Sequence, residues 1–433
     1  MIRKLVLAAA SALLIAAPAS AQNQNQTLAI VNARVVSMGP AGDLPRGAVL
    51  VRDGKIVEVG ANVRVPDGAR VIDAAGQTLT PGLVATVSSL GLNDTIGSGW
   101  GGRGSNDPRL SAGFDVAYDV NPNSPQIPEA RIEGVTSAVL TPNPASAGAG
   151  APRKVFGGQA AFIRLAADGD YLVAPHVAVL TALGESGASS AGGGRGAWRG
   201  LVKQSLALAR DYKAGRVDEA RLDALSLSRA DLQALVPIAE RRSPLLVEVN
   251  RASDIRLVLD VAKEENIRVV LSGAAEAWML AGEIAAAKVP VILDAEDNQA
   301  FTFDSLNATY RNAAILDQAG VLIAFKPGIA RIVFLIRTPR FLAGRTVRFG
   351  LPWERALAAI TVNPARIFGL EETRGSIAPG KAADLVLWSG DPLETSTVAR
   401  RVFVEGAEQP MTARNRELRD RYINTVKPAR AAR

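Results

Sequence analysis

Histidine and cysteine, the side chains that most often carry nucleophilic or metal chemistry, are nearly missing from this sequence. It contains no Cys and one His, His176. The lack of Cys excludes disulfides, thiolate metal sites and a cysteine nucleophile. A Ser-His-Asp triad would need His176 as its base, and no G-x-S-x-G nucleophile elbow is present, since the nearest approach, at 184–188, ends in alanine. Because His176 stands between Pro175 and Val177, we expect it to be a packed or surface side chain.

Carboxylates are the remaining candidates for metal or acid–base chemistry. Glu248, Asp294 and Glu296 stand at or just after the ends of predicted strands. An all-oxygen site built from them would suit Mg²⁺ or Ca²⁺ rather than Zn²⁺. The competing interpretation, which we favour, is that Asp294 and Glu296 only solvate a loop.

The elements that would position these side chains alternate between strands and helices. Leu245–Val249 is an apolar run suited to a strand buried on both faces, and a helical pattern follows over 253–265, with Ser253 as its expected N-cap. This rhythm indicates parallel α/β structure, and several such units favour a (β/α)8 barrel, whose active sites lie at the carboxyl ends of the strands. Further strands are predicted at 267–271, 289–293 and 320–325, and helices at 274–287 and 353–368.

Both ends of the chain are rich in β structure, which suggests that they pair into one small domain. Residues 28–80 contain an Asp53-Gly54 hairpin turn, and short strands are predicted at 383–388 and 399–405. The predicted domains are a signal peptide (1–21), a composite β-sandwich (22–80 and 376–412), a barrel (81–375) and a basic C-terminal tail (413–433).

Two kinds of segment interrupt this pattern. The glycine-rich stretches 97–104 and 184–196 lack phosphate-cradle spacing, and we expect loops over one face of the barrel. A helical insertion lies between Arg199 and Arg242, where Ser228 and Asp231 resemble a capping box.

The first 21 residues are typical of a signal peptide. Arg3 and Lys4 precede a short apolar stretch, and Ala19-Ser20-Ala21 forms a small-residue cleavage site. We therefore expect a periplasmic or secreted product, cleaved near Ala21, without a membrane span. The formal net charge of +7 lies partly in the tail, where no aromatic residue follows Tyr422, so we expect no nucleic-acid partner.

Three short motifs resemble the amidohydrolase superfamily, most nearly its imidazolonepropionase-like members. They are Thr80-Pro81-Gly82-Leu83-Val84, the run ITVNPARIFGL at 360–370, and the run GSIAPGKAADL at 375–385, which GDPL follows at 390–393. The resemblance covers about residues 28–408. It implies a barrel that hydrolyses C–N bonds, in which an H-x-H pair, further His and a final Asp bind zinc or another divalent metal and activate water.

At the positions that correspond to these ligands, the sequence carries other residue types. They are Val87, Ser89, Glu248, Ser272 and Gly328. Valine has no lone pair and a serine hydroxyl is a weak ligand, so we expect a member without the metal-ligand histidines and without a bound cofactor. One hypothesis is that Glu248 pairs with Lys326, together with Arg251, in place of the metal. The alternative is that all three are exposed on loops.

Three functions remain open from the sequence. The chain could be a non-catalytic partner of an active homologue, in a hetero-oligomer or as a homo-oligomer. It could be an active hydrolase with a divergent, carboxylate-based metal site. It could also be a periplasmic protein that binds a small molecule in the barrel mouth.

Overall fold

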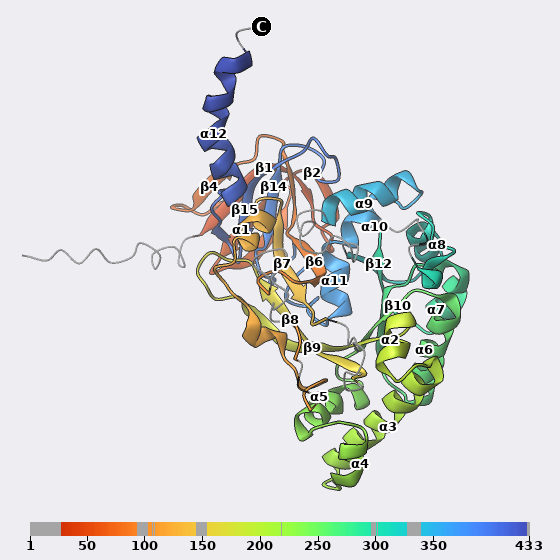
Figure 1. Cartoon of the computed structure of the whole chain (residues 1–433). Helices are drawn as coiled ribbons and strands as arrows, with labels where there is room; N and C mark the ends of the chain where they lie inside the picture. The colour runs from red at the N-terminus through yellow and green to blue at the C-terminus, as the bar shows by residue number, and fades with distance from the viewer. Residues whose placement is uncertain are drawn as a thin grey trace, which may run out of the picture.

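Two eight-stranded sheets form the two parts of the molecule (Figure 1). The computed structural model describes residues 27–92, 103–105, 107, 109–143, 154–217, 219–295, 300, 302–326 and 339–430. The signal peptide predicted at 1–21 lies outside these residues. So do Glu296 and Gly328.

The first sheet joins the two ends of the chain. Its strand order is β16-β15-β14-β5-β1-β2-β3, with β4 paired to β1. Strand β5 pairs with β14, and the Trp388 indole Nε1 donates to Thr80 Oγ1 across this junction at 2.9 Å. The predicted composite β-sandwich is therefore confirmed. The strands are β1 (Leu28–Val36), β2 (Asp43–Arg52), β3 (Lys55–Gly60), β4 (Arg70–Asp73), β5 (Thr78–Pro81), β14 (Leu385–Trp388), β15 (Ala399–Val404) and β16 (Ala407–Glu408).

The second sheet is the barrel, with strand order β13-β12-β11-β10-β9-β8-β7-β6. The Thr86 hydroxyl on β6 donates to the Phe325 carbonyl on β13, which joins the two edges. The barrel strands are β6 (Leu83–Ser88), β7 (Val135–Leu140), β8 (Phe156–Arg164), β9 (Leu172–Ala182), β10 (Leu245–Val249), β11 (Val269–Gly273), β12 (Val291–Asp294) and β13 (Ile323–Lys326).

The predicted barrel is confirmed, with one difference from an ideal (β/α)8 arrangement. Strand β8 runs antiparallel to both β7 and β9, whereas the other neighbouring pairs within this sheet are parallel. The connection from β8 to β9 is too short to hold a crossover helix, and antiparallel neighbours need none.

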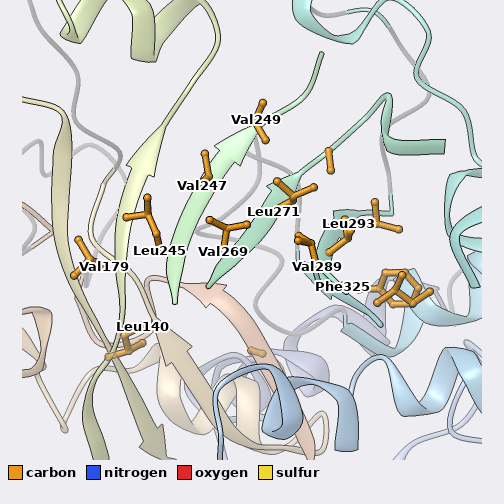
Figure 2. Close-up of a cluster of buried hydrophobic side chains, with 14 of the residues drawn as sticks. Leu140, Val179, Leu245, Val247, Val249, Val269, Leu271, Val289, Leu293 and Phe325 are labelled. Carbon is orange, nitrogen blue, oxygen red and sulfur yellow. The ribbon is translucent and has the colours of Figure 1, made fainter. Parts of the chain in front are cut away.

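Alternate residues of the barrel strands face opposite ways, as two-sided burial requires. Val247, Leu271 and Leu293 belong to the cluster that packs outward toward the helices (Figure 2). Leu246, Val270, Ile292 and Ala324 belong to a separate cluster inside the barrel. The helices beside these strands are α6 (Ala252–Glu264), η3 (Ala277–Leu280), α7 (Ala281–Ala286), α8 (Asn312–Gln318), α9 (Pro339–Arg348), α10 (Trp353–Ala358) and α11 (Val362–Ile367).

The insertion forms helices α3 (Arg195–Lys213), α4 (Glu219–Ala224) and α5 (Arg229–Ala239). The predicted capping box of Ser228 and Asp231 is confirmed at the start of α5. The glycine-rich stretch after β9 is not only loop, because it contains helix α2 (Glu185–Ser190).

Four further elements complete the described chain: η2 (Val116–Asp119), α1 (Gln126–Arg131), η4 (Phe303–Ser305) and α12 (Arg414–Arg430). Helix α12 occupies most of the predicted basic tail and projects from the body (Figure 1). Among the described residues, no helix combines the length and apolar character needed to cross a membrane.

Candidate functional site at the barrel mouth

Four predicted site residues meet at the carboxyl ends of the barrel strands, which we call the mouth. Glu248, Ser272, Asp294 and Lys326 each stand two positions after a residue of the inner cluster, so they face the barrel interior. Glu248 is the register partner of Ser272, and Asp294 is the register partner of Lys326. The structure therefore places these four side chains at one end of the barrel.

The backbone at the mouth is strained where β6 ends. Val87 has φ 49° although it is β-branched and buried, and the β6–β7 register shifts between Ala85 and Ser88. A β-branched residue with positive φ is an outlier, and such strain gathers at functional sites. Ser89, directly after this register shift, is fully buried.

Three hydroxyl groups at the mouth are buried without a partner. Ser89, Thr141 and Ser272 are at most 1% exposed, and within the described structure no hydrogen bond reaches their side-chain oxygens. They follow or end β6, β7 and β11. A buried hydroxyl that makes no hydrogen bond costs about 1 to 3 kcal/mol. These three groups therefore mark a place that can accept a polar molecule.

Lys326 is the most enclosed charge at the mouth. Its side chain belongs to the largest fully buried ones, and the residue is 2% exposed. In the part of the chain that the structure describes, no ion pair or hydrogen bond reaches the Lys326 ammonium group. An ammonium group removed from water needs an anionic partner to repay its desolvation.

Arg103 is a second buried cation, which the sequence analysis missed. It is 9% exposed, its carbonyl accepts from the Asn143 amide at 2.6 Å just beyond β7, and its Nε has no partner among the described residues. Burial lowers the pKa of the Arg103 guanidinium, and the negative charge of Glu248 raises it. Arg103 therefore lies within electrostatic reach of the mouth. No local sequence signal could have found it, because it lies in the glycine-rich stretch 97–104.

The expected pairing of Glu248 with Lys326 and Arg251 is not formed. Among the described residues, no ion pair joins Glu248 to either cation. Strands β11 and β12 separate Glu248 from Lys326, and Arg251 is exposed, where it forms the N-cap of α6. The charge of Glu248 acts instead on Arg103, whose pKa it raises against the effect of burial.

His176 lies away from the mouth, in the first half of β9. Its side chain is 51% exposed, and its Nε2 lies 2.6 Å from Asp115 Oδ2. The hydrogen bond with Asp115 raises the pKa of the His176 imidazole above its ordinary value of 6.5. The histidine is therefore a surface residue, one of the two alternatives expected from the sequence, and it has a carboxylate partner.

Comparisons with known proteins identify the fold and its relatives. Residues 283–413, which carry the second and third motifs, match the model of the Amidohydrolase family. The structure is similar to an amidohydrolase from Thermotoga maritima, with a TM-score of 0.77 and 26% identity, over 88% of this chain and 99% of that one. These matches support a place for the chain in the amidohydrolase superfamily.

Curated relatives match shorter segments of this chain. It is 48% identical to a 5'-deoxyadenosine deaminase from Methanosarcina acetivorans over 58 residues, which are 13% of each protein. It is 37% identical to an imidazolonepropionase from Porphyromonas gingivalis over 87 residues, which are 19% of this chain and 20% of that protein. The chain thus matches a fifth or less of the length of these relatives.

The likeness to the superfamily corrects our expectation about cofactors. We expected none, but amidohydrolase-superfamily proteins are generally metal-dependent, so the expectation is wrong for this family.

The described side chains do not fit the metal centre of the superfamily. Within the described residues, no group of three or more His, Cys, Asp or Glu side chains is placed to hold a metal ion. Ser89 and Ser272 offer only hydroxyls, Val87 offers no donor, and the Lys326 ammonium group would repel a divalent cation. Glu248 and Asp294 are the carboxylates that the described mouth provides.

Hydrogen bonds hold the rim of the mouth rigid. The carboxylate of Glu276, which is 4% exposed, accepts from the Ala252 amide at 2.9 Å and from the Asn307 amide and Nδ2 at 3.1 and 3.0 Å. These bonds tie together the loops that follow β10, β11 and β12. The Ala252 bond also replaces the cap expected from Ser253, because the N-cap of α6 is Arg251, two residues earlier.

A second set of polar contacts fixes the loop after β9. The Arg195 guanidinium pairs with Asp254 and Asp304, each at 2.7 Å, and the Asp304 carboxylate accepts from the Glu185 amide at 2.7 Å. The walls around the mouth are therefore preorganised, a property that a binding site and an active site share.

Proposed function

We propose that this chain is an exported amidohydrolase-superfamily protein, related to hydrolases of C–N bonds, whose function is to bind a small polar molecule in the barrel mouth. It does not hydrolyse that molecule by the histidine-dependent route of the superfamily. Of the three functions left open by the sequence, the small-molecule binding protein agrees best with the arrangement of the mouth.

The position of the single histidine carries this proposal. A histidine-ligated centre needs several imidazoles at the carboxyl ends of the strands. The sequence contains one His, and that residue pairs with Asp115 in the first half of β9. The mouth keeps the rigid rim and the inward-facing polar side chains of a binding site.

Export is part of the proposal and rests on the residues before the fold. Arg3, Lys4, the apolar stretch and Ala19-Ser20-Ala21 are typical of a cleaved signal. Mass spectrometry of the protein from a bacterial periplasmic fraction should give a chain that begins at Gln22. An intact Met1 in the cytoplasmic fraction would contradict export.

A hydrolysis assay tests the loss of catalysis. The purified mature chain, supplied with zinc or manganese, is mixed with a panel of N-acyl amino acids, dipeptides and cyclic amides. We expect no turnover above a protein-free blank. Turnover that chelation abolishes, and that is lost in both Glu248→Gln and Asp294→Asn, would replace this proposal with the carboxylate-based hydrolase.

A second candidate function, a non-catalytic partner of an active homologue, is favoured by apolar side chains on the rim. Met279, Phe303 and Leu306, on the loops after β11 and β12, are 49%, 77% and 59% exposed. Large apolar side chains exposed together mark interaction surfaces. The Trp278 indole donates to the Asn307 carbonyl at 2.9 Å and helps to fix the same loop.

The partner function predicts a complex that depends on this rim. If the gene neighbours that of a histidine-containing homologue, the two proteins should elute together in size-exclusion chromatography after co-expression. Phe303→Asp with Leu306→Asp should separate them, whereas Tyr118→Asp, which changes an exposed aromatic residue on another surface, should not. Separate elution of the unmodified proteins would contradict a partner role.

A further inference from the structure

We propose that a groove at the amino ends of β10, β11 and β12 binds an organic anion with an apolar body. The groove lies between the carboxyl-terminal parts of α6 and α7 and has a volume of about 780 Å³, within the range of small-molecule sites. It is at the end of the barrel opposite the mouth, so this inference is independent of the function proposed for the mouth.

The floor of the groove is apolar. Val269 and Val289 lie at or just before the starts of neighbouring strands, and both are buried (Figure 2). Leu259 is half-buried, and Ala286 and Ala287 are exposed. The small side chains of the two alanines leave the space beside the end of α7 open. Apolar surface that lines a groove favours a ligand that covers it with apolar groups of its own.

Basic side chains surround this floor. They come from three helix-to-strand connections and from the last turn of α6, and they are Arg241, Lys263, Arg268 and Lys288. Within the described residues, no ion pair reaches any of them. Arg241 donates instead to the Asn266 side chain, and Arg268 donates to the Arg242 carbonyl at 3.4 Å. Each bond holds a guanidinium in place and uses only one of its five N–H donors.

The two carboxylates of the lining are occupied by cations that lie outside it. Glu283 pairs with Arg256, with Oε1 2.7 Å from Nη2 and Oε2 3.0 Å from Nε. The charge of Asp260 acts on Arg199 and Arg256. The cations of the groove therefore outnumber its acids and have no carboxylate of their own, so the groove attracts an anion.

The helix dipole accounts for only part of this basic lining. The carboxyl end of a helix carries partial negative charge, which attracts Lys263 in the last turn of α6 and Lys288 just beyond α7. This attraction falls off within the last turn of a helix. It does not account for Arg268, which stands beyond the turn and directly before β11.

Two of the cations stand where the backbone favours glycine. Arg241 and Lys288 directly follow the C-caps of α5 and α7, with φ of 62° and 52°. At the matching position after α8, outside the groove, the chain has Gly320. Positive φ is unfavourable for residues other than glycine, so long cationic side chains stand at the groove at a cost in backbone energy. Such a cost is typical of functional sites.

Three probes test the ligand class on the full mature chain. The dye anilinonaphthalenesulfonate carries an apolar body and one anionic group, phenylnaphthylamine has the same rings without the sulfonate, and inorganic sulfate is an anion without the body. We expect the sulfonate dye to bind at least about tenfold more tightly than either other probe, which is the effect of about one charge-assisted hydrogen bond. Fluorescence titration measures the two dyes and calorimetry measures sulfate. Equal binding of the uncharged dye, equal binding of sulfate, or no binding of the sulfonate dye would overturn the proposal.

Two competitors distinguish the possible sources of the anion. Displacement of the bound sulfonate dye by decanoate would identify an aliphatic acid as the ligand, and displacement by naphthoate would identify an aromatic acid. Displacement by neither would overturn the proposal, because both offer an apolar body with one carboxylate.

Variants locate the bound dye. Arg268→Met combined with Lys288→Gly removes two cations of the groove, and glycine suits the positive φ at position 288. We expect at least about tenfold weaker binding of the sulfonate dye without a lower melting temperature. The matched control, Arg348→Met combined with Arg400→Met, removes two exposed cations outside the groove and should change binding less than about twofold. Unchanged binding in the first variant, or equal weakening in the control, would overturn the proposal.

Discussion

The Nε2 atom of His176 lies 2.6 Å from the Oδ2 atom of Asp115, and this pair joins β9 to the segment before η2. Asp115 also accepts from the Ala117 amide at 2.9 Å, which caps η2. The carboxylate is 10% exposed and the imidazole 51%. A charged imidazole is therefore favoured at this position, and the chain has no other histidine to obscure its titration.

The first prediction follows from this pair. The hydrogen bond with Asp115 raises the pKa of His176, so NMR titration of its single imidazole should give a value above 6.5, and Asp115→Asn should lower it. Because the folded state holds the proton more tightly, the stabilisation is fully present below about pH 6.5 and is lost as pH rises through the folded pKa. Its size should be at most about 1 kcal/mol, since the imidazole is half exposed. A pKa that Asp115→Asn leaves unchanged would contradict the pairing.

The second prediction concerns the rim. Glu276→Ala should lower the free energy of unfolding by about 2 to 4 kcal/mol, because three donors lose a buried carboxylate acceptor. Hydrogen exchange should accelerate at the amides of Ala252 and Asn307. Glu283→Ala is the control: that carboxylate is exposed and pairs with Arg256 on the surface, so its loss should cost less than about 1 kcal/mol. Equal losses of unfolding free energy in the two variants, measured by urea denaturation, would show that Glu276 does not hold these loops together.

The third prediction compares two buried threonines. Thr86→Val removes the hydroxyl that bonds to Phe325 across the barrel seam and should cost about 1 kcal/mol. Thr141→Val removes a hydroxyl without a described partner and should be neutral or stabilising. Chemical denaturation of both variants measures the difference. A loss of stability in Thr141→Val as large as in Thr86→Val would mean that Thr141 has a partner in the ligand-free protein.

The fourth prediction concerns the contact between barrel and sandwich. Gly134 has φ 90°, and a Cβ there would lie 2.3 Å from the Trp388 ring, so Gly134→Ala combines backbone strain with overlap. It should lower stability by about 3 kcal/mol or more. Gly169 has nearly the same φ, 86°, with open space around it, so Gly169→Ala should cost only about 1 to 2 kcal/mol. Similar melting temperatures for the two variants would contradict the close packing against Trp388.

Much of the fold could be predicted because it depends on local pattern. The strand Leu245–Val249 was predicted at its observed bounds, since both of its faces are buried and no other element fits such a run. The Asp53-Gly54 turn was also correct: both residues have positive φ, as a tight hairpin requires. The next three strands begin two or three residues later than predicted, because apolar residues that lead into a strand look like the strand itself.

The remaining features depend on contacts that local pattern does not encode. The predicted helix over 353–368 is two helices, α10 and α11, interrupted near Thr361, whose hydroxyl bonds to the Leu357 carbonyl. In the mouth, the resemblance named Glu248 and Lys326 as candidate site residues, but it could not say which charges meet. Arg103 and Glu248 are far apart in the sequence, so their electrostatic interaction is apparent only in the structure.

The junction between Thr80 and Trp388 has a consequence for the order of folding. These residues are 308 positions apart in the chain, yet they bond within one sheet. Until β14 has been synthesised, β5 presents an open edge, and the first five strands cannot complete their layer. Contacts this distant in sequence form late, because the intervening loop must close first. In the proposed export, this delay leaves the sandwich sheet incomplete until the end of the chain has been delivered, and the sheet then closes from both ends on the far side of the membrane.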